Sequence, residues 1–260
     1  MTILLLTSLG VNAEESNSGP LFMKDMLGGK EFFDPWGVGI DFFTMKQDYA
    51  IKSLSFDLPG LEVDDFSLID VSNEVQNYDL KLDVWITPFL NVFALAGRVD
   101  ADTMVNLSAI PIDAAGNNLG TQIVSYDGTV YGGGFNLMYG GEHWFVALNN
   151  TWTGTKLSGN FDSSVSAYTA QPRIGLIKDK WTVYLGGMYL DTSEKHSGTI
   201  ELAFPGTAPI PVPFSVELES LDHWNYTVGV IHVFSPRAHL LLELGFGDRD
   251  HTLFNFTYRF

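Results

Sequence analysis

The feature that most constrains this chain is a strict two-residue alternation of apolar and polar side chains. In residues 78–86, every second position holds an apolar side chain (tyrosine, leucine, valine or isoleucine), and the positions between them include Asp79, Lys81 and Asp83. Successive side chains of a β-strand point to opposite faces, so this period predicts strands with one apolar and one polar face. A short helix competes with the strand pattern only in residues 21–27.

Ten segments carry this alternation, and the connections between them alternate in length. The segments are residues 36–48, 78–86, 93–102, 131–139, 144–152, 168–176, 181–189, 224–234, 240–246 and 254–260. Short connections lie at 87–90, 140–142, 178–180, 235–237 and 248–251, and long ones at 49–74, 105–127, 155–165 and 191–221. Short periplasmic turns and long extracellular loops are typical of outer-membrane barrels. We therefore predict an all-β fold, a single antiparallel transmembrane β-barrel of about 10 strands, with 8 or 12 as alternatives.

The composition excludes several other classes of protein. The chain has 14 Lys and Arg against 31 Asp and Glu, a net charge of −17, which excludes a nucleic-acid partner because that would need a basic face. It has no cysteine, which excludes disulfide scaffolds, thiol catalysis and cysteine zinc sites. No apolar run approaches the roughly 20 residues of a membrane-spanning helix. We expect no cofactor and no bound metal.

The first residues have the features of an export signal. An apolar run over residues 3–11 is followed by Asn12 and Ala13, which fits a signal-peptidase site. No Lys or Arg precedes the run, so either the true start lies upstream or the segment is not a signal peptide. We expect a signal peptide in 1–13, a periplasmic tail in 14–35 and the barrel in 36–260.

Several charged residues fall on the polar parity and are expected to face the barrel interior. A tight turn at Pro88 would pair Leu82 with Leu95 and Asp79 with Arg98, with apolar partners on one face and charged partners on the other. The resulting interior set is Asp79, Lys81, Asp83, Arg98, Asp100, Arg173 and Glu243, joined by Asp41, Asp102 and Arg259. These residues form either an ion-pair network or the lining of a narrow solute path. Their spacing does not discriminate the two.

Aromatic residues lie where the membrane interfaces are expected. Trp144 and Trp152 share the outward parity, and so do Trp181 and Tyr189. Eight residues at about 3.3 Å each, tilted by about 40°, span roughly 20 Å along the membrane normal, close to the apolar band of about 25 Å.

The C-terminal residues 254–260 carry a resemblance to a known class. Phe256, Tyr258 and Phe260 alternate, and the chain ends on the last of them. This segment resembles the terminal strand of bacterial outer-membrane β-barrel proteins, at the level of the superfamily. The resemblance implies a location in the bacterial outer membrane, contact with lipid and lipopolysaccharide, and recognition of the final phenylalanine by the barrel assembly machinery. The strand number also resembles that of the omptin surface proteases, without a match that carries over catalytic residues.

Three functions remain open from the sequence. The leading hypothesis is a non-enzymatic surface barrel with a structural or interaction role, because residues 48–74 hold seven acidic residues against one lysine and form a long acidic loop that suits divalent cations or an extracellular partner. The second is a narrow channel for small solutes. The third is a surface hydrolase using His223 or His251, each of which follows an aspartate. Adjacent strand residues point to opposite faces, so any dyad would have to form between strands. A proline-rich tract at residues 208–213 is expected to stiffen the largest loop.

Overall fold

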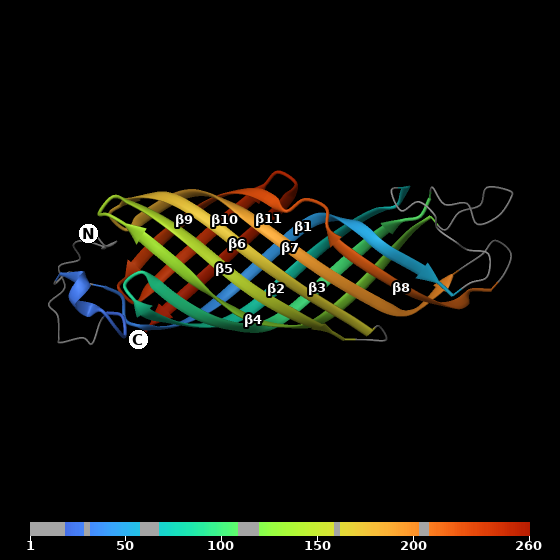
Figure 1. Ribbon diagram of the computed structural model, residues 1–260, viewed down its shortest axis with the longest axis horizontal. Helices are drawn as coiled ribbons and strands as arrows, with labels where there is room; N and C mark the ends of the chain where they lie inside the picture. Colours follow the sequence, from blue (N-terminus) through green and yellow to red (C-terminus); the bar gives the residue numbers. More distant parts are fainter. Residues whose placement is uncertain (1–18, 29–31, 58–67, 109–119, 159–161, 203–207) are drawn as a thin grey trace.

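A computed structural model describes residues 19–28, 32–57, 68–108, 120–158, 162–202 and 208–260. The expected signal peptide, residues 1–13, lies outside the described residues, as does part of the expected tail. The described chain forms one antiparallel sheet rolled into an elongated barrel (Figure 1). Its elements are η1 (Lys24–Leu27), β1 (Trp36–Phe56), β2 (Asp70–Thr87), β3 (Leu90–Asn106), β4 (Thr121–Gly140), β5 (Trp144–Leu157), β6 (Asp162–Lys178), β7 (Trp181–Leu202), β8 (Ile210–Ser220), β9 (Trp224–Ser235), β10 (Ala238–Phe246) and β11 (Arg249–Arg259). Among these residues, no helix is both long and apolar enough to cross a membrane.

Ten of the eleven described strands form a closed ring. The order runs from β11 through β10, β9 and β7 to β1, and β1 closes the ring by pairing with β11 from Gly37–Arg259 to Gln47–Arg249. Closure leaves no open edge, which a barrel in lipid requires because unpaired backbone groups there are costly. The predicted number of transmembrane strands is confirmed.

The outer face of this ring is apolar between two aromatic borders. Large exposed apolar side chains cover it, among them Ile40, Leu80, Leu82, Ile174, Leu176, Val183 and Leu185. Trp144 and Trp152 are exposed at the two ends of this band on β5, as the sequence predicts. A closed antiparallel ring with this outer surface is the architecture of bacterial outer-membrane proteins, and it confirms the predicted class and location. The exposed outer face also carries Phe256, Tyr258 and Phe260 on and after β11; their role in assembly stays a prediction.

Beyond the apolar band the strands continue where the sequence predicted loops. The expected loops at 49–74 and 191–221 are wrong over much of their length, because β1 runs to Phe56, β2 begins at Asp70 and β7 runs to Leu202. In this outer region the pattern is inverted. Side chains such as Val71 and Leu218 are buried inside, while Asp70 and Glu219 face water. The inversion follows from the solvent, since lipid covers the outer face lower down and water covers it here.

Strand β8 builds the far end of the barrel and was not predicted as a strand. It pairs with β7 from Ser193–Glu219 to Leu202–Ile210 and with β1 from Tyr49–Ser220 to Phe56–Phe214. It thus takes the place that β9, β10 and β11 occupy in the membrane (Figure 1). Part of the proline-rich tract lies in β8. Pro213 accepts a hydrogen bond from Asp57 on the β1 side, so its missing N–H faces the side where pairing with β1 ends.

The register between β2 and β3 corrects the predicted orientation of Arg98 and Asp100. Asp79 lies opposite Gly97 and Lys81 opposite Leu95, one residue away from the expected pairing, because the register shifts between Trp85 and Thr87. An extra residue in one strand reverses the faces of all that follow. Arg98 and Asp100 therefore face outward, as does Asp102. The Arg98 side chain is 73% exposed and pairs with Asp127 at 3.2 Å.

Arg249 lies where β9, β10 and β11 end and β8 takes their place in the barrel wall. It is 2% exposed, and its guanidinium donates to the carbonyl oxygens of Asp222 at 2.6 Å and His223 at 2.8 Å. A third contact reaches the carbonyl oxygen of Met188 at 3.5 Å. One side chain therefore brings a charged donor to three carbonyl oxygens at the point where the strand pairing changes.

We expect Arg249→Met to lower the free energy of unfolding by about 3 kcal/mol, because buried carbonyl oxygens lose a charged donor. Urea unfolding in lipid vesicles, followed by tryptophan fluorescence, measures the change. Arg98→Met, at an exposed arginine, is the control and should change stability little. Equal effects of the two substitutions would show that Arg249 does not stabilise this part of the barrel wall.

Candidate functional site

The periplasmic end of the lumen is filled by an ion pair and the segment that precedes β1. Arg259 Nη2 donates to Asp83 Oδ1 at 2.6 Å, and the same oxygen accepts from Asn91 Nδ2 at 2.6 Å. The guanidinium lies over the rings of Phe33 and Trp85, at 5.6 and 5.8 Å from their centroids. These contacts fix the preceding segment against the barrel mouth.

Midway along the membrane region, Glu243 is the centre of a second network. It is 0% exposed, and its carboxylate accepts from Arg173 Nη2 at 2.7 Å and from Tyr184 Oη at 2.7 Å. Gln171 Nε2 donates to it at 3.1 Å, and His251 Nε2 lies 3.4 Å away. A charge this deeply buried is tolerated because its acceptor oxygens have several donors.

The sequence-predicted interior residues therefore divide into two groups. The inner face of the barrel carries Asp79, Lys81, Asp83, Arg173 and Glu243. Lys81 Nζ is 3.5 Å from Asp41 Oδ2, so most of these charges have partners. Arg98 and Asp100 lie outside and belong to neither network.

We expect Arg173→Met to cost about 3 to 5 kcal/mol of stability, because Glu243 would remain buried without its cation. Combining it with Glu243→Gln removes the stranded charge and should recover part of the loss. Urea titrations of both variants in lipid vesicles provide the test. A double variant less stable than Arg173→Met would contradict the assigned pairing.

The two histidines considered for hydrolysis lie in different environments. The His251 side chain is fully buried in the lumen beside Glu243. His223 is half-exposed at the membrane border, with its Nε2 4.0 Å from Asp191 Oδ1 on the neighbouring strand β7. The sequence excluded a dyad with the adjacent aspartate but left a cross-strand pair open. In the described part of the chain, no group of three or more His, Cys, Asp and Glu side chains is arranged to hold a metal.

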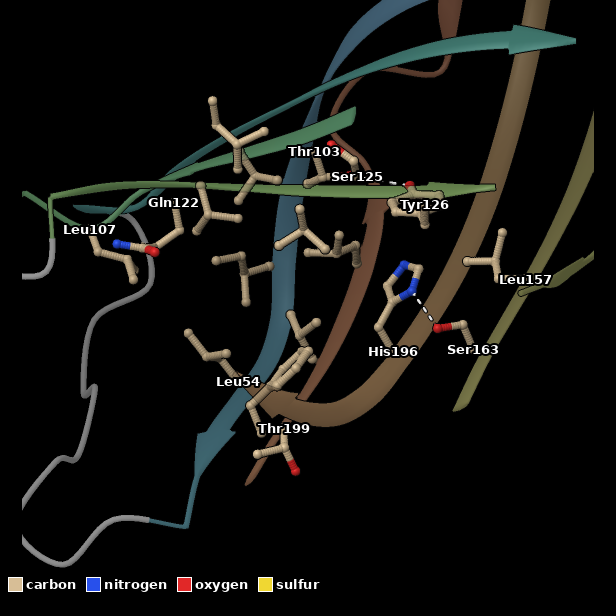
Figure 2. Close-up of a pocket in the computed structure, with 18 of the residues that line it drawn as sticks. Leu54, Thr103, Leu107, Gln122, Ser125, Tyr126, Leu157, Ser163, His196 and Thr199 are labelled. Carbon is tan, nitrogen blue, oxygen red and sulfur yellow. Dashed lines mark hydrogen bonds between the residues drawn. The ribbon is translucent and has the colours of Figure 1, made fainter. Parts of the chain in front are cut away.

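The outer end of the barrel contains an apolar chamber of about 450 Å³ (Figure 2). Its walls come from the outer parts of β1 to β8, including Leu157 of β5 and Ser163 of β6. The apolar lining residues include Ile51, Leu54, Phe56, Val71, Val105, Leu107, Val124, Phe214, Val216 and Leu218. The apolar parity of the inverted pattern thus encloses a space large enough for a small organic molecule.

A belt of polar side chains forms the inner boundary of this chamber. Tyr49 donates a short hydrogen bond to Glu194, and His196 lies 3.1 Å from the other oxygen of that carboxylate. His196 also bonds Ser163 at 3.0 Å, a contact that Figure 2 shows. The ring of Tyr126 on β4 lies 5.6 Å from the ring of His196, measured between centroids.

Burial changes the acid–base behaviour of the two belt tyrosines. Desolvation raises the pKa of Tyr49 well above its usual value, and the nearby carboxylate of Glu194 raises it further. Desolvation, with a contribution from the same carboxylate, also raises the pKa of Tyr126. Both phenols therefore stay neutral as the pH rises past the ordinary tyrosine pKa of about 10. Their contribution to stability is complete below that pH and is lost as the pH rises toward the folded value.

For the folded protein, we expect Tyr126→Phe to leave the increase in absorbance at 295 nm unchanged up to about pH 11, because this phenol does not ionise there. The unfolded protein is the internal control. There the same substitution removes one of ten tyrosines and should reduce the increase by about a tenth. A reduced increase in the folded protein would show that Tyr126 is accessible to solvent.

Sequence reasoning missed the chamber because its residues lie in stretches interpreted as loops. The sequence nonetheless contains a strand pattern in one of these stretches. Val71, Asn73 and Val75 alternate with polar residues in the sequence, as strand residues do. What the sequence could not show was that the apolar parity turns inward here, since that depends on where lipid ends.

Comparisons with known proteins do not identify a family. No protein-family model matches the chain, and no curated protein matches its sequence. Among solved structures, the outer membrane protein OprG from Pseudomonas aeruginosa is 11% identical with a TM-score of 0.44, covering 88% of this chain and 98% of that chain. The beta domain of the Bordetella autotransporter BrkA is 12% identical with a TM-score of 0.38, covering 87% and 100%. The Ralstonia pickettii toluene transporter TbuX is 9% identical with a TM-score of 0.33, covering 87% and 90%. Likeness at this level assigns the chain neither a family nor an activity.

Proposed function

We propose that this outer-membrane barrel captures small apolar molecules from the external side and holds them in the outer chamber. The observation that carries the proposal is the chamber itself, an apolar cavity of about 450 Å³ walled by strands that extend beyond the membrane. The apolar side chains on the inner face of these strands leave an open space between them instead of filling it. A cavity of this size and lining suits a small apolar ligand.

The polar belt adds a hydrogen-bonding end to the chamber. Tyr126, Ser163 and His196 line the same cavity as the apolar residues. An apolar cavity with a few convergent polar groups favours ligands that have an apolar body and one polar group. Aromatic alcohols and related small molecules have this form.

A wide aqueous pore is less compatible with the interior. The lumen holds the Glu243–Arg173 pair and, nearer the periplasm, the Asp83–Arg259 pair with aromatic rings packed on it. Barrels of similar strand number are largely filled by their own side chains. We therefore place capture of a ligand before free diffusion of ions among the functions of this barrel.

We expect Val216→Asp to weaken binding of 1-naphthol to the full-length protein in lipid nanodiscs by about tenfold or more, since a charge on the chamber wall opposes an apolar ligand. Naphthol fluorescence reports binding. Ser215→Asp is the matched control, because Ser215 is the neighbouring residue on the water-facing side of β8. Equal affinity in both variants, or no binding to the unmodified protein, would refute the proposal.

A further inference from the structure

A second cavity of about 220 Å³ lies deeper in the barrel than the chamber. The two cavities share Tyr126 and Leu157 as lining residues, so they are neighbours across the polar belt. Phe43, Val99 and Leu190 form part of its apolar wall. At about 30 Å³ for each water, its volume equals that of about seven water molecules.

The charges that line this inner cavity are all negative. Three carboxylates face it, those of Asp41, Asp79 and Glu194, and no lysine, arginine or histidine is among its described lining residues. Two of the three have partners. Asp41 pairs with Lys81 and accepts from Asn255, and Glu194 is bonded by Tyr49 and His196.

Asp79 is the third carboxylate of the cavity, and it has no such partner among the described residues. It is 9% exposed, it forms no ion pair with the described residues, and its Oδ1 has no hydrogen-bond partner. Two residues away on the same face of β2, Asn77 Oδ1 is also buried without a partner and also lines the cavity. Each of these two lining residues thus has a buried oxygen that lacks a donor. An unpaired buried carboxylate is costly, so a cationic donor would be stabilised there.

The remaining wall selects among cations. Threonine hydroxyls line the cavity from β5, β6 and β7, at Thr151, Thr153, Thr155, Thr169 and Thr192. Calcium would need six to eight oxygen ligands. Among the described residues, no three His, Cys, Asp or Glu side chains are grouped so that they could hold a metal ion. An alkylammonium ion needs only one carboxylate and a few acceptors, and its apolar chain suits the apolar wall beside Phe43.

We propose that the inner cavity binds a small organic cation, a primary ammonium with a short apolar chain, with Asp79 as its counter-ion. The ammonium donates to the carboxylate of Asp79, and the chain lies against the apolar wall. This site is separate from the outer chamber and does not depend on ligand capture there.

Isothermal titration of the full-length protein in lipid nanodiscs with n-butylammonium tests the proposal. We expect saturable binding that Asp79→Asn weakens by about tenfold or more. Asp100→Asn is the matched control, because this aspartate lies on the outward face of β3 and should leave the affinity unchanged. n-Butanol, a neutral molecule of similar size, should bind much more weakly than n-butylammonium.

Two further variants keep the test decisive. Ala101→Leu fills the cavity without changing its charge and should also weaken n-butylammonium binding, which covers the case that Asp79→Asn does not fold. Val216→Asp alters only the outer chamber and should leave n-butylammonium affinity unchanged, so the two proposals fail separately. The inference is overturned if the unmodified protein does not bind n-butylammonium, if n-butanol binds equally well, or if Asp79→Asn and Asp100→Asn behave alike.

Discussion

The pairing of β1 with β11 is the constraint on which the rest of the structure depends. In lipid every backbone amide must find a partner within the protein, and this pairing removes the last free edge of the sheet. Once the ring is closed, the alternation of side chains divides every strand into a lipid face and a lumen face. The exposed apolar band, the buried ion pairs and both cavities are consequences of that division.

Where the strands extend beyond the membrane, the same alternation places apolar side chains on the inner face of the barrel. Within the membrane the apolar parity of most strands faces lipid and the polar parity faces the lumen, whereas on β3 Leu95 and Val99 face the lumen. Above the aromatic border, water covers the outside, and buried side chains such as Val71 and Leu218 face inward. Strand β8 makes this possible by completing the wall between β7 and β1 where β9 to β11 have ended. The apolar chamber exists because the solvent outside the barrel changes along its length.

Two buried carboxylates differ in how many hydrogen-bond donors surround them. Glu243 has an arginine, a tyrosine, a glutamine and a histidine around it, so it stabilises the wall it belongs to. Asp79 has a glycine, Gly97, directly opposite and an oxygen without a partner. The same residue class is thus structural in one place and available for a ligand in the other, and local pairing makes the difference.

The sequence by itself determined the strands in the membrane, because lipid and lumen impose a period of two that neither a helix nor a loop would keep. It also determined the barrel class and the placement of Trp144 and Trp152. Only the tertiary structure decided the faces of Arg98 and Asp100, since one extra residue near Trp85 reverses the register and no local pattern records it. The strand β8 and the two cavities likewise depend on pairing between distant segments. Parity is a local property that a sequence carries, whereas the side of the wall that each parity faces is set by the closed ring and by the solvent around it.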